Sequence, residues 1–351
     1  MAGVFDIDFF SNNVPVWTPI SGVEALLSFL RGAFLDSYDF SNVRIHHSGA
    51  YEINSSNFKI NLTGETFLLK RWSPKSDYNT IEKTVELMAW IAGEQLPVPS
   101  PLKFKNDRFI ATWDGYLWSY FPFIEGKYFM GSLGELNEAA IITGRLTQHL
   151  SKIPQSIHPD DGPQHLTEQD DLIIQRMNGS RKSWRRIFGQ DDAQLLDDKW
   201  DELRNDWVRL KSSRLQAGPV APVHFDLHPH NLLVDGSRIT GVLDFESCKQ
   251  MPIGYALAFS ALKQCRQAVV YSQGQKQPEL IGRSYVKTLS EAIKGIEPCF
   301  PCFADLALAE VLRRLCIIFR LNLDENNNVW NKVLPIQLNH LAEAKILFNQ
   351  L

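Results

Sequence analysis

The stretch that decides the fold runs from Val223 to Val234 and reads VHFDLHPHNLLV; after a turn at Asp235-Gly236 it continues into ITGVLDFE, residues 239–246. Two short apolar runs flank the tight turn, and polar groups stand at the outer end of each run, which predicts a hairpin with its chemistry at one end. The polar residues form a His-x-Asp, an Asn five residues after that Asp, and another Asp thirteen residues after the Asn. A lone His-x-Asp would be a weak signal, whereas the complete array is specific.

This combination of groups is the one that phosphoryl transfer requires. One carboxylate must orient and deprotonate the attacking hydroxyl, while an amide oxygen and a second carboxylate hold the magnesium ions that bridge the phosphates. Protein kinases use H-R-D-x-x-x-x-N and then D-F-G for these tasks. The matching residues here are Asp226, Asn231 and Asp244. The alternative, that both aspartates are solvated surface acids, leaves their joint spacing unexplained.

The segment HFDLHPHN, residues 224–231, resembles the H-G-D-L-H-P-G-N stretch of the aminoglycoside-phosphotransferase family, which includes choline, homoserine, fructosamine and several sugar kinases. The segment GVLDFE, residues 241–246, resembles the metal-binding strand of that family. The resemblance implies that Asp226 is the catalytic base and that Asn231 and Asp244 are the magnesium ligands. It also implies structural roles for His224 and His228, which would brace the loop.

Three positions depart from the family pattern. Phe225 and His230 stand where the family loop usually has glycines, so a large ring lies next to the catalytic Asp226. Further on, YALA at residues 255–258 replaces the usual Y-D-L-A. The missing acid normally supports the loop, so we expect another group to orient Asp226.

The order of the expected elements favours an α+β, protein-kinase-like fold with two lobes. Apolar spacing predicts a helix at 23–35, strands at 43–47, 57–62 and 66–72, a helix at 77–93, and strands at 108–113 and 116–121. The remaining chain has mainly helical spacing, notably at 135–152, 160–216, 255–271, 279–294, 303–321 and 335–349. We therefore expect a small antiparallel sheet in a nucleotide-binding lobe, residues 1–122, and a mainly helical lobe with the catalytic loop and substrate site, residues 123–351.

A lysine at the end of the third predicted strand is the candidate for binding the nucleotide phosphates. Lys70 follows Phe-Leu-Leu, so its ammonium must reach solvent or an anion. The resemblance implies that this lysine contacts the α- and β-phosphates of ATP. Its usual partner is a glutamate on the next helix, but Thr84 occupies the expected position, and the choice between Glu82, Glu86 and no partner stays open.

Two other segments are expected to contact ATP. The loop at 48–57 lies where a phosphate-covering loop belongs, and Gly49, Ser55 and Ser56 offer backbone and hydroxyl donors, although an ordinary hairpin loop fits nearly as well. The segment YFPFIEG, residues 120–126, is the expected hinge between the lobes. There the carbonyl of Pro122 and the N–H of Ile124 would pair with adenine, since a proline can supply a carbonyl; a plain linker is the alternative.

The acceptor is expected to bind between the catalytic loop and the helices at about 127–216 and 255–321. Acids that could line a cleft for polycations occur at Asp160, Asp161, Glu168, Asp170 and Asp171, but solvated loop acids are the simpler interpretation. The predicted helix 303–321 carries Arg313, Arg314 and Arg320, which indicate either helix surface or contacts with an anionic or neutral substrate group. These features favour a sugar, an amino alcohol or a hydroxy amino acid over an aminoglycoside.

Composition limits the class of protein. The chain has 351 residues and a formal net charge of −4, which does not favour binding to nucleic acid. We expect neither a signal peptide nor a membrane span, and hence a cytoplasmic location. The five cysteines are odd in number and scattered, so we expect free thiols even for the C-x-x-C at 299–302.

Together these patterns predict an ATP- and magnesium-dependent kinase that phosphorylates a hydroxyl of a small metabolite. An aminoglycoside-modifying phosphotransferase and a non-catalytic nucleotide-binding pseudokinase are the alternatives. A protein kinase is disfavoured because no A-P-E motif or activation segment follows Asp244.

Overall fold

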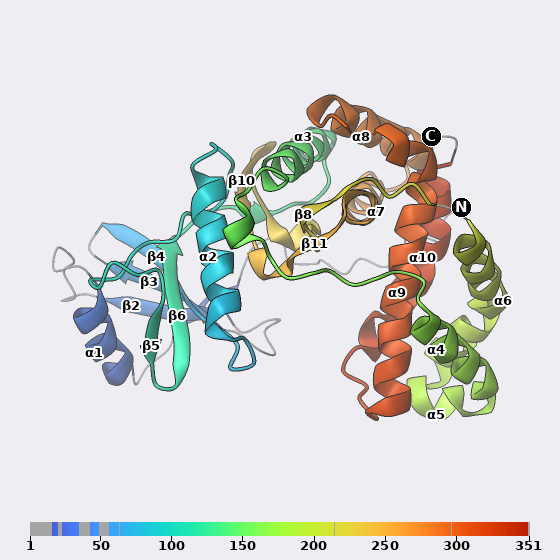
Figure 1. The fold of residues 1–351 in the computed structure, drawn as a ribbon, viewed down its shortest axis with the longest axis horizontal. Helices are drawn as coiled ribbons and strands as arrows, with labels where there is room; N and C mark the ends of the chain where they lie inside the picture. The colour runs from blue at the N-terminus through green and yellow to red at the C-terminus, as the bar shows by residue number, and fades with distance from the viewer. Residues whose placement is uncertain are drawn as a thin grey trace.

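The architecture of the chain is seen in a computed structural model that describes residues 16–19, 23–34, 43–48, 56–62, 64–213, 215–295 and 297–349. Figure 1 shows a sheet with two helices, formed by the first third of the chain, beside a larger region made mostly of helices. The predicted α+β architecture, with a small antiparallel sheet before a mainly helical region, is confirmed.

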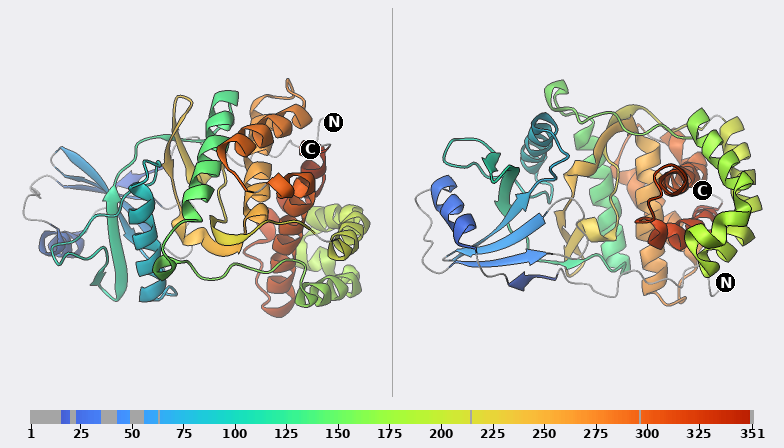
Figure 2. Two further views of the ribbon diagram at one scale, coloured as in Figure 1. Left: turned by 45° about the horizontal axis from the view of Figure 1, so that its top comes forward. Right: turned by 90° about the horizontal axis from the view of Figure 1, so that it is seen from below.

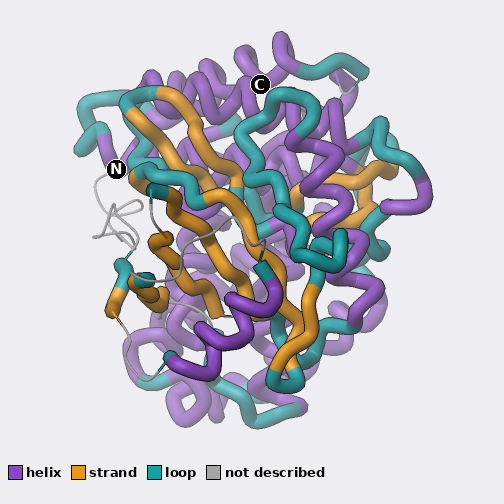
Figure 3. The backbone as a smooth tube through the Cα atoms, turned by 90° about the vertical axis from the view of Figure 1, so that its left-hand side faces the viewer, coloured by secondary structure: helices purple, strands orange, loops and turns teal. Residues whose placement is uncertain are grey.

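The amino-terminal sheet has six antiparallel strands in the order β1-β2-β3-β4-β6-β5. The strands are β1 (Thr18–Pro19), β2 (Arg44–Ser48), β3 (Ser56–Leu62), β4 (Glu65–Arg71), β5 (Ala111–Trp113) and β6 (Tyr116–Pro122). Asp114 and Gly115 both have positive φ, as the predicted hairpin turn between β5 and β6 requires. One face of the sheet packs against α1 (Glu24–Ala33), and in Figure 3 the strands lie in front of most of the helices.

Helix α2 (Tyr78–Ala92) lies between this sheet and the helical region (Figures 1 and 2). Asp77 caps its first turn by accepting a hydrogen bond from the Thr80 N–H over 2.9 Å. Its apolar stripe, which includes Ile81, Val85 and Met88, belongs to a core that continues into the helical region. The side chains that α2 buries therefore join the two parts of the molecule.

The helical region contains eight α-helices among its described residues. They are α3 (Leu133–Leu150), α4 (Glu168–Gly179), α5 (Trp184–Phe188), α6 (Gln190–Ser212), α7 (Ile253–Tyr271), α8 (Pro278–Ala292), α9 (Phe303–Asp324) and α10 (Leu334–Leu347). Helix α3 begins with a capping box between Ser132 and Glu135. Helices α4, α5 and α6 pack near α9 and α10, at the end of the molecule far from the sheet (Figure 1).

Short strands between the two parts carry the decisive sequence. Strands β9 (Leu232–Asp235) and β10 (Arg238–Val242) form the predicted hairpin, and β7 (Lys127–Tyr128) joins its edge. Strand β8 (Val220–His224) pairs with β11 (Cys248–Pro252). The linker after β6 passes so close to the hairpin that a Cβ at Gly126 would lie 3.0 Å from the Cβ of Leu233. A glycine here lets the linker approach the β9–β10 hairpin closely.

Two composition-based expectations can be compared with this fold. Across the described ranges, none of the helices combines the length and apolar character that crossing a bilayer would demand. All five cysteines are free and four of them are buried, which confirms that the C-x-x-C at 299–302 is not a disulfide.

Candidate active site

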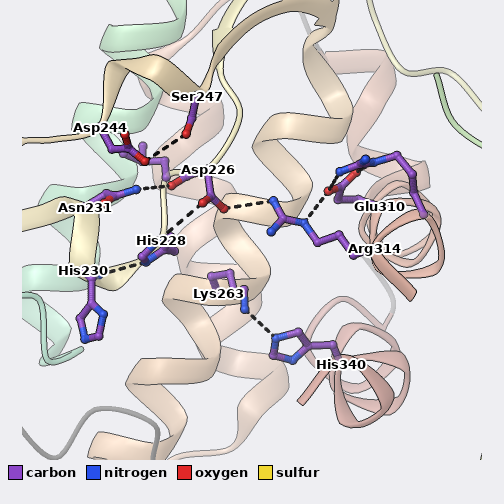
Figure 4. A network of polar contacts seen from close by, with 12 residues as sticks. Asp226, His228, His230, Asn231, Asp244, Ser247, Lys263, Glu310, Arg314 and His340 are labelled. Atoms are coloured by element: carbon purple, nitrogen blue, oxygen red, sulfur yellow. Dashed lines mark hydrogen bonds and ion pairs between the residues drawn. The ribbon is translucent and has the colours of Figure 1, made fainter. Parts of the chain in front are cut away.

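The catalytic loop joins β8 to β9 and is fixed by its own side chains. The Asn231 amide donates from Nδ2 to the backbone oxygen of Asp226 over 2.8 Å, and the His230 N–H donates to Nδ1 of His228 over 3.2 Å (Figure 4). Because Asn231 uses its amide nitrogen for the loop, its Oδ1 oxygen is left to bind another group. The loop thus holds Asp226 and Asn231 side by side.

Asp244 is brought to the same place by the end of β10. Its backbone is left-handed, with φ 63° and ψ 53°, and Ser247 Oγ donates to its Oδ2 over 3.1 Å. His224 donates from Nε2 to the backbone oxygen of Leu243 over 2.8 Å, and burial lowers the pKa of His224, which keeps the ring neutral. Figure 4 shows Asp226, Asn231 and Asp244 gathered at one point, as the sequence predicts.

The oxygens of Asn231 and Asp244 suit a hard divalent cation that also takes phosphate and water oxygens. Asp244 is exposed, and Asn231 Oδ1 is not among the buried side-chain oxygens that lack a partner. Within the described ranges no cluster of three His, Cys, Asp or Glu side chains could form an all-protein metal site. The residues therefore fit a magnesium ion held partly by the nucleotide.

A guanidinium from α9 contacts the predicted catalytic carboxylate. Arg314 Nη2 donates to Asp226 Oδ1 over 3.0 Å, and His228 Nε2 lies 3.7 Å from Oδ2. Burial opposes the ionisation of Asp226, but Arg314 and, less strongly, His228 and Lys263 lower the pKa of Asp226 to about 2. Oδ1 is thus occupied, whereas no hydrogen bond to Oδ2 occurs among the described residues.

A buried glutamate holds Arg314 in place. Glu310 has no exposed side-chain surface; its carboxylate accepts from Arg314 Nε over 2.6 Å and from Arg313 Nε and Nη2 over 2.7 and 2.8 Å. His165 Nε2 lies 2.8 Å from the same carboxylate, and its ring stacks on Tyr255 with centroids 3.7 Å apart. Burial raises the pKa of Glu310, but the two arginines outweigh it and lower that pKa well below its usual range.

Phe225, the unexpected ring in the loop, is part of the same assembly. The guanidinium carbons of Arg313 and Arg314 lie 5.1 and 5.7 Å from its ring centroid, and Arg314 also lies 4.1 Å from the centroid of Phe259. Ala256 replaces the acid that supports the loop in the family. In this chain Arg314 of α9 contacts Asp226 instead, which identifies the group that the sequence analysis expected to orient Asp226.

A second buried network continues from the catalytic loop towards α10. Lys263 Nζ lies 3.0 Å from His340 Nε2 (Figure 4). The other ring nitrogen of His340 contacts Glu343. Arg266 donates to Glu343 over 2.9 Å and neutralises its charge. Burial and the neighbouring Arg314 lower the pKa of Lys263 to about 8, so Lys263 is still mostly protonated at neutral pH.

Lys70 lies on β4 with its ammonium directed to the metal-binding segment. It forms an ion pair with Glu246, two residues after Asp244, and lies 4.5 Å from the ring of Trp72. The glutamate partner of Lys70 was expected on the helix at 77–93. At the expected position on that helix, Thr84 donates to the backbone oxygen of Thr80 over 2.9 Å. The recorded ion pair thus joins Lys70 to the same segment as Asp244.

The remaining predicted nucleotide contacts are placed only in part. Gly49 and Ser55 lie outside the described residues, and Ser56 begins β3. Pro122 ends β6 and lies opposite Phe67 of β4. The next hydrogen bond between the two segments runs from the Phe123 N–H to the Thr66 oxygen, so Pro122 and Phe67 form a non-hydrogen-bonded pair of the antiparallel ladder. The Pro122 carbonyl is therefore outside the β4–β6 ladder. Half-buried Ile124 follows in the linker, so both adenine contacts stay predictions.

Most acids considered for a polycation cleft serve local structure. Asp170 completes the capping box of Thr167 on α4, and Asp171 accepts from Trp207 Nε1 over 2.6 Å and pairs with Lys211. Asp160 lies 3.7 Å from Lys83. These contacts give the acids structural roles, but Glu168, Asp170 and Asp171 lie in the first turn of α4 and not in a solvated loop as expected.

Sequence reasoning did not assign Glu246 or Glu310, nor the contact of Arg314 with Asp226. Glu246 stands in the quoted metal-binding segment, but nothing local connects it to a lysine 176 residues away. The arginines of α9 were noted, and Glu310 lies three and four residues before them, on the same helical face. That spacing is the signal that could have indicated the buried Glu–Arg group.

A small antiparallel sheet before a helical region, with an Asp–Asn–Asp array between them, defines the class of small-molecule kinases with a protein-kinase-like fold. The family model described as "Phosphotransferase enzyme family" matches residues 50–282, and the chain belongs to this family. It is therefore a phosphotransferase.

Individual relatives agree with this assignment. A homoserine kinase from Rhodopseudomonas palustris is 23% identical over 242 residues, which cover 67% of this chain and 68% of the relative. An amicoumacin kinase in complex with AMP-PNP and Ca²⁺ has a similar fold, with a TM-score of 0.61, 12% identity, and coverage of 93% of this chain and 94% of that one. A microcompartment-associated aminopropanol kinase gives a TM-score of 0.58 with 16% identity, over 92% and 95% of the two chains.

Proposed function

We propose that this phosphotransferase transfers the γ-phosphate of ATP, with magnesium, to a hydroxyl of a small metabolite such as a sugar, an amino alcohol or a hydroxy amino acid. The observation that carries the proposal is the meeting of Asp226, Asn231 and Asp244 at one end of the β9–β10 hairpin (Figure 4). The kinship with homoserine and aminopropanol kinases supports a small hydroxyl compound as the acceptor.

Asp226 would orient the acceptor and take its proton. Its Oδ1 is held by Arg314, and Oδ2 is directed to His228 at 3.7 Å, beyond hydrogen-bonding distance. The acceptor hydroxyl would donate to Oδ2, and its oxygen would form a bond to the γ-phosphorus as the bond from phosphorus to the ADP oxygen breaks. The hydroxyl proton passes to Asp226, so atoms and charge balance. Positioning supplies most of the acceleration because the carboxylate is fixed at one oxygen before the acceptor arrives.

The other residues would bind the nucleotide. Asn231 and Asp244 would hold magnesium, which when bound neutralises charge on the phosphates. Lys70 would contact the α- and β-phosphates, for which it must exchange its ion pair with Glu246 for the nucleotide. The Pro122 carbonyl and the Ile124 N–H would pair with adenine, and Gly49, Ser55 and Ser56 would cover the phosphates.

A direct assay tests this proposal. The purified protein is incubated with magnesium and ATP against hexosamines, neutral sugars, choline, ethanolamine, homoserine and aminoglycosides, with ADP release and product mass as readouts. We expect acceptor-dependent ADP release and a phosphorylated product from at least one small alcohol, both at least roughly a hundredfold slower with Asp226→Ala. ATP binding without any phosphorylated product across the panel would contradict the proposal.

A further inference from the structure

The guanidinium of Arg314 has one edge, with Nε and Nη2, that donates hydrogen bonds within the protein, and an open edge at Nη1. Its Nε donates to Glu310 and its Nη2 to Asp226, whereas Nη1 has no hydrogen-bond partner in the described parts of the chain. The side chain keeps 23% of its surface exposed, and Nη1 is not among the atoms buried without a partner. The open edge is therefore accessible beside the catalytic carboxylate, where the acceptor must bind.

This edge is held in a fixed direction. The fully buried Glu310 accepts a hydrogen bond from Nε of Arg314, and Asp226 accepts one from Nη2. The centroid of the Phe259 ring lies 4.1 Å from the guanidinium carbon. A guanidinium that is already immobilised loses little further freedom when it binds a ligand. The open edge of Arg314 is thus preorganised to donate hydrogen bonds to a planar anionic group of a ligand.

The charges around this position leave one positive charge in excess. Around Arg314, the cations Arg313, Arg314 and Lys263 lie with the carboxylates of Asp226 and Glu310. Asp244 adds a carboxylate beside Asp226 that the proposed magnesium ion would neutralise, and the deeper Arg266–Glu343 pair is neutral by itself. His228 and His340 add no charge near neutral pH because burial lowers the pKa of each. A single negative charge on the acceptor would restore the balance.

We propose that the open edge of Arg314 binds a carboxylate of the acceptor, so that the substrate is a small hydroxy acid or hydroxy amino acid whose hydroxyl reaches Asp226. This inference rests on the proposed function and narrows its acceptor class. A carboxylate carries one charge and matches the planar fork of arginine. A phosphate ester would bring up to two charges, more than the excess. A cationic acceptor group at this edge would meet the like charge of Arg314.

Matched pairs of acceptors test the inference in the wild-type protein with magnesium and ATP. Each pair differs in the carboxylate alone: 4-hydroxybutyrate with 1,4-butanediol, glycerate with glycerol, gluconate with sorbitol, and homoserine with homoserine amide. We expect kcat/KM to favour the acid by roughly tenfold to a hundredfold in the pair that turns over best, as for a hydrogen bond to a charged group. Turnover that favours the neutral member would overturn the inference and leave the proposed function standing. No turnover of any pair, while another alcohol of the panel is phosphorylated, would overturn the inference alone; no turnover of the pairs or of the panel would contradict both.

Variants on one helix assign the preference to the proposed residue. Arg314→Gln should reduce the ratio of acid to neutral kcat/KM to about one, mainly through the KM of the acid. Arg320→Gln is the matched control, because Arg320 is exposed on the same helix and the change in charge is the same. Should Arg314→Gln fail to fold, Arg314→Lys keeps a positive charge beside Glu310 but lacks the planar guanidinium. The ratio of acid to neutral kcat/KM of Arg314→Lys should then fall at least several-fold. A ratio that stays at its wild-type value in the folded variant would overturn the assignment.

Discussion

Arg314 on α9 donates to Asp226 on the catalytic loop over 3.0 Å, and thereby connects two segments that are 88 residues apart in the sequence. The contact gives the loop the support that Ala256 cannot provide. It also holds Oδ1 of Asp226 and leaves Oδ2, to which we propose that the acceptor hydroxyl donates, without a hydrogen bond among the described residues. Glu310 accepts a hydrogen bond from Arg314 and so fixes the side chain that orients Asp226.

The buried Glu310 should matter for stability as well as for the site. Replacing it with glutamine removes the charge that Arg313 and Arg314 share and leaves Arg314 paired with Asp226 alone. Breaking a buried pair costs about 3–5 kcal/mol. We expect Glu310→Gln to lower the midpoint of thermal unfolding by several degrees at pH 7. Glu291→Gln makes the same change at an exposed position and should have little effect. Equal midpoints for the two variants would show that the buried group does not stabilise the fold.

The same residue predicts a dependence of stability on pH. The pKa of Glu310 is lowered in the folded protein, whereas it is near 4.3 in an unfolded chain. Its contribution to the free energy of unfolding is therefore complete above about pH 4.3 and is lost as the pH falls towards the folded pKa. Denaturant titrations between pH 7 and pH 3 should show a smaller loss of stability in Glu310→Gln than in the wild type. Parallel curves would contradict this assignment.

Lys70 should affect nucleotide binding more than folding. Lys70→Met removes the cation that we expect to contact the ATP phosphates, and a hydrogen bond to a charged group corresponds to roughly a tenfold to hundredfold change in affinity. The Kd of ATP, measured by calorimetry with magnesium, should rise by that factor. Lys103→Met, at an exposed lysine, is the control. An unchanged Kd for Lys70→Met would remove Lys70 from the nucleotide site.

Asp244 offers a clean test of metal binding because of its backbone. Its left-handed conformation is one that asparagine also tolerates, so Asp244→Asn should fold normally. Loss of the charge should lower kcat by roughly a hundredfold or more, since a bound metal supplies several kcal/mol of transition-state stabilisation. Asp235→Asn, an exposed turn position, should keep full activity. Activity of Asp244→Asn with an unaltered magnesium requirement would exclude Asp244 as a ligand.

Local patterns in the sequence predicted most of the architecture. Apolar periodicity located the helices α1, α2, α3 and α7 to α10 and the strands β2, β3, β4 and β6 to within a few residues, because each of these elements buries a continuous face. Residues 160–216 were expected only to be helical, and the structure divides them into α4, α5 and α6. The Asp–Asn–Asp array also depends on a short stretch of chain, so its gathering at the end of the hairpin could be foreseen.

Contacts between distant segments could not be predicted in the same way. The pairing of Lys70 with Glu246 and of Arg314 with Asp226 depends on how the sheet and α9 are placed around the catalytic hairpin. Nothing near Lys70 in the sequence indicates Glu246, and the arginines of α9 resemble those of an ordinary helix surface. Arg320 is indeed exposed, whereas Arg313 and Arg314 point to the buried Glu310.

The role of Asp226 is the central claim, and one pair of measurements tests it most directly. For Asp226→Asn and Asp226→Ala we would measure kcat with the best acceptor and the Kd of ATP with magnesium. The account predicts that kcat falls by roughly a hundredfold to ten-thousandfold while the Kd of ATP stays near the wild-type value. An unchanged kcat in folded variants would contradict the assignment of Asp226 as the catalytic base.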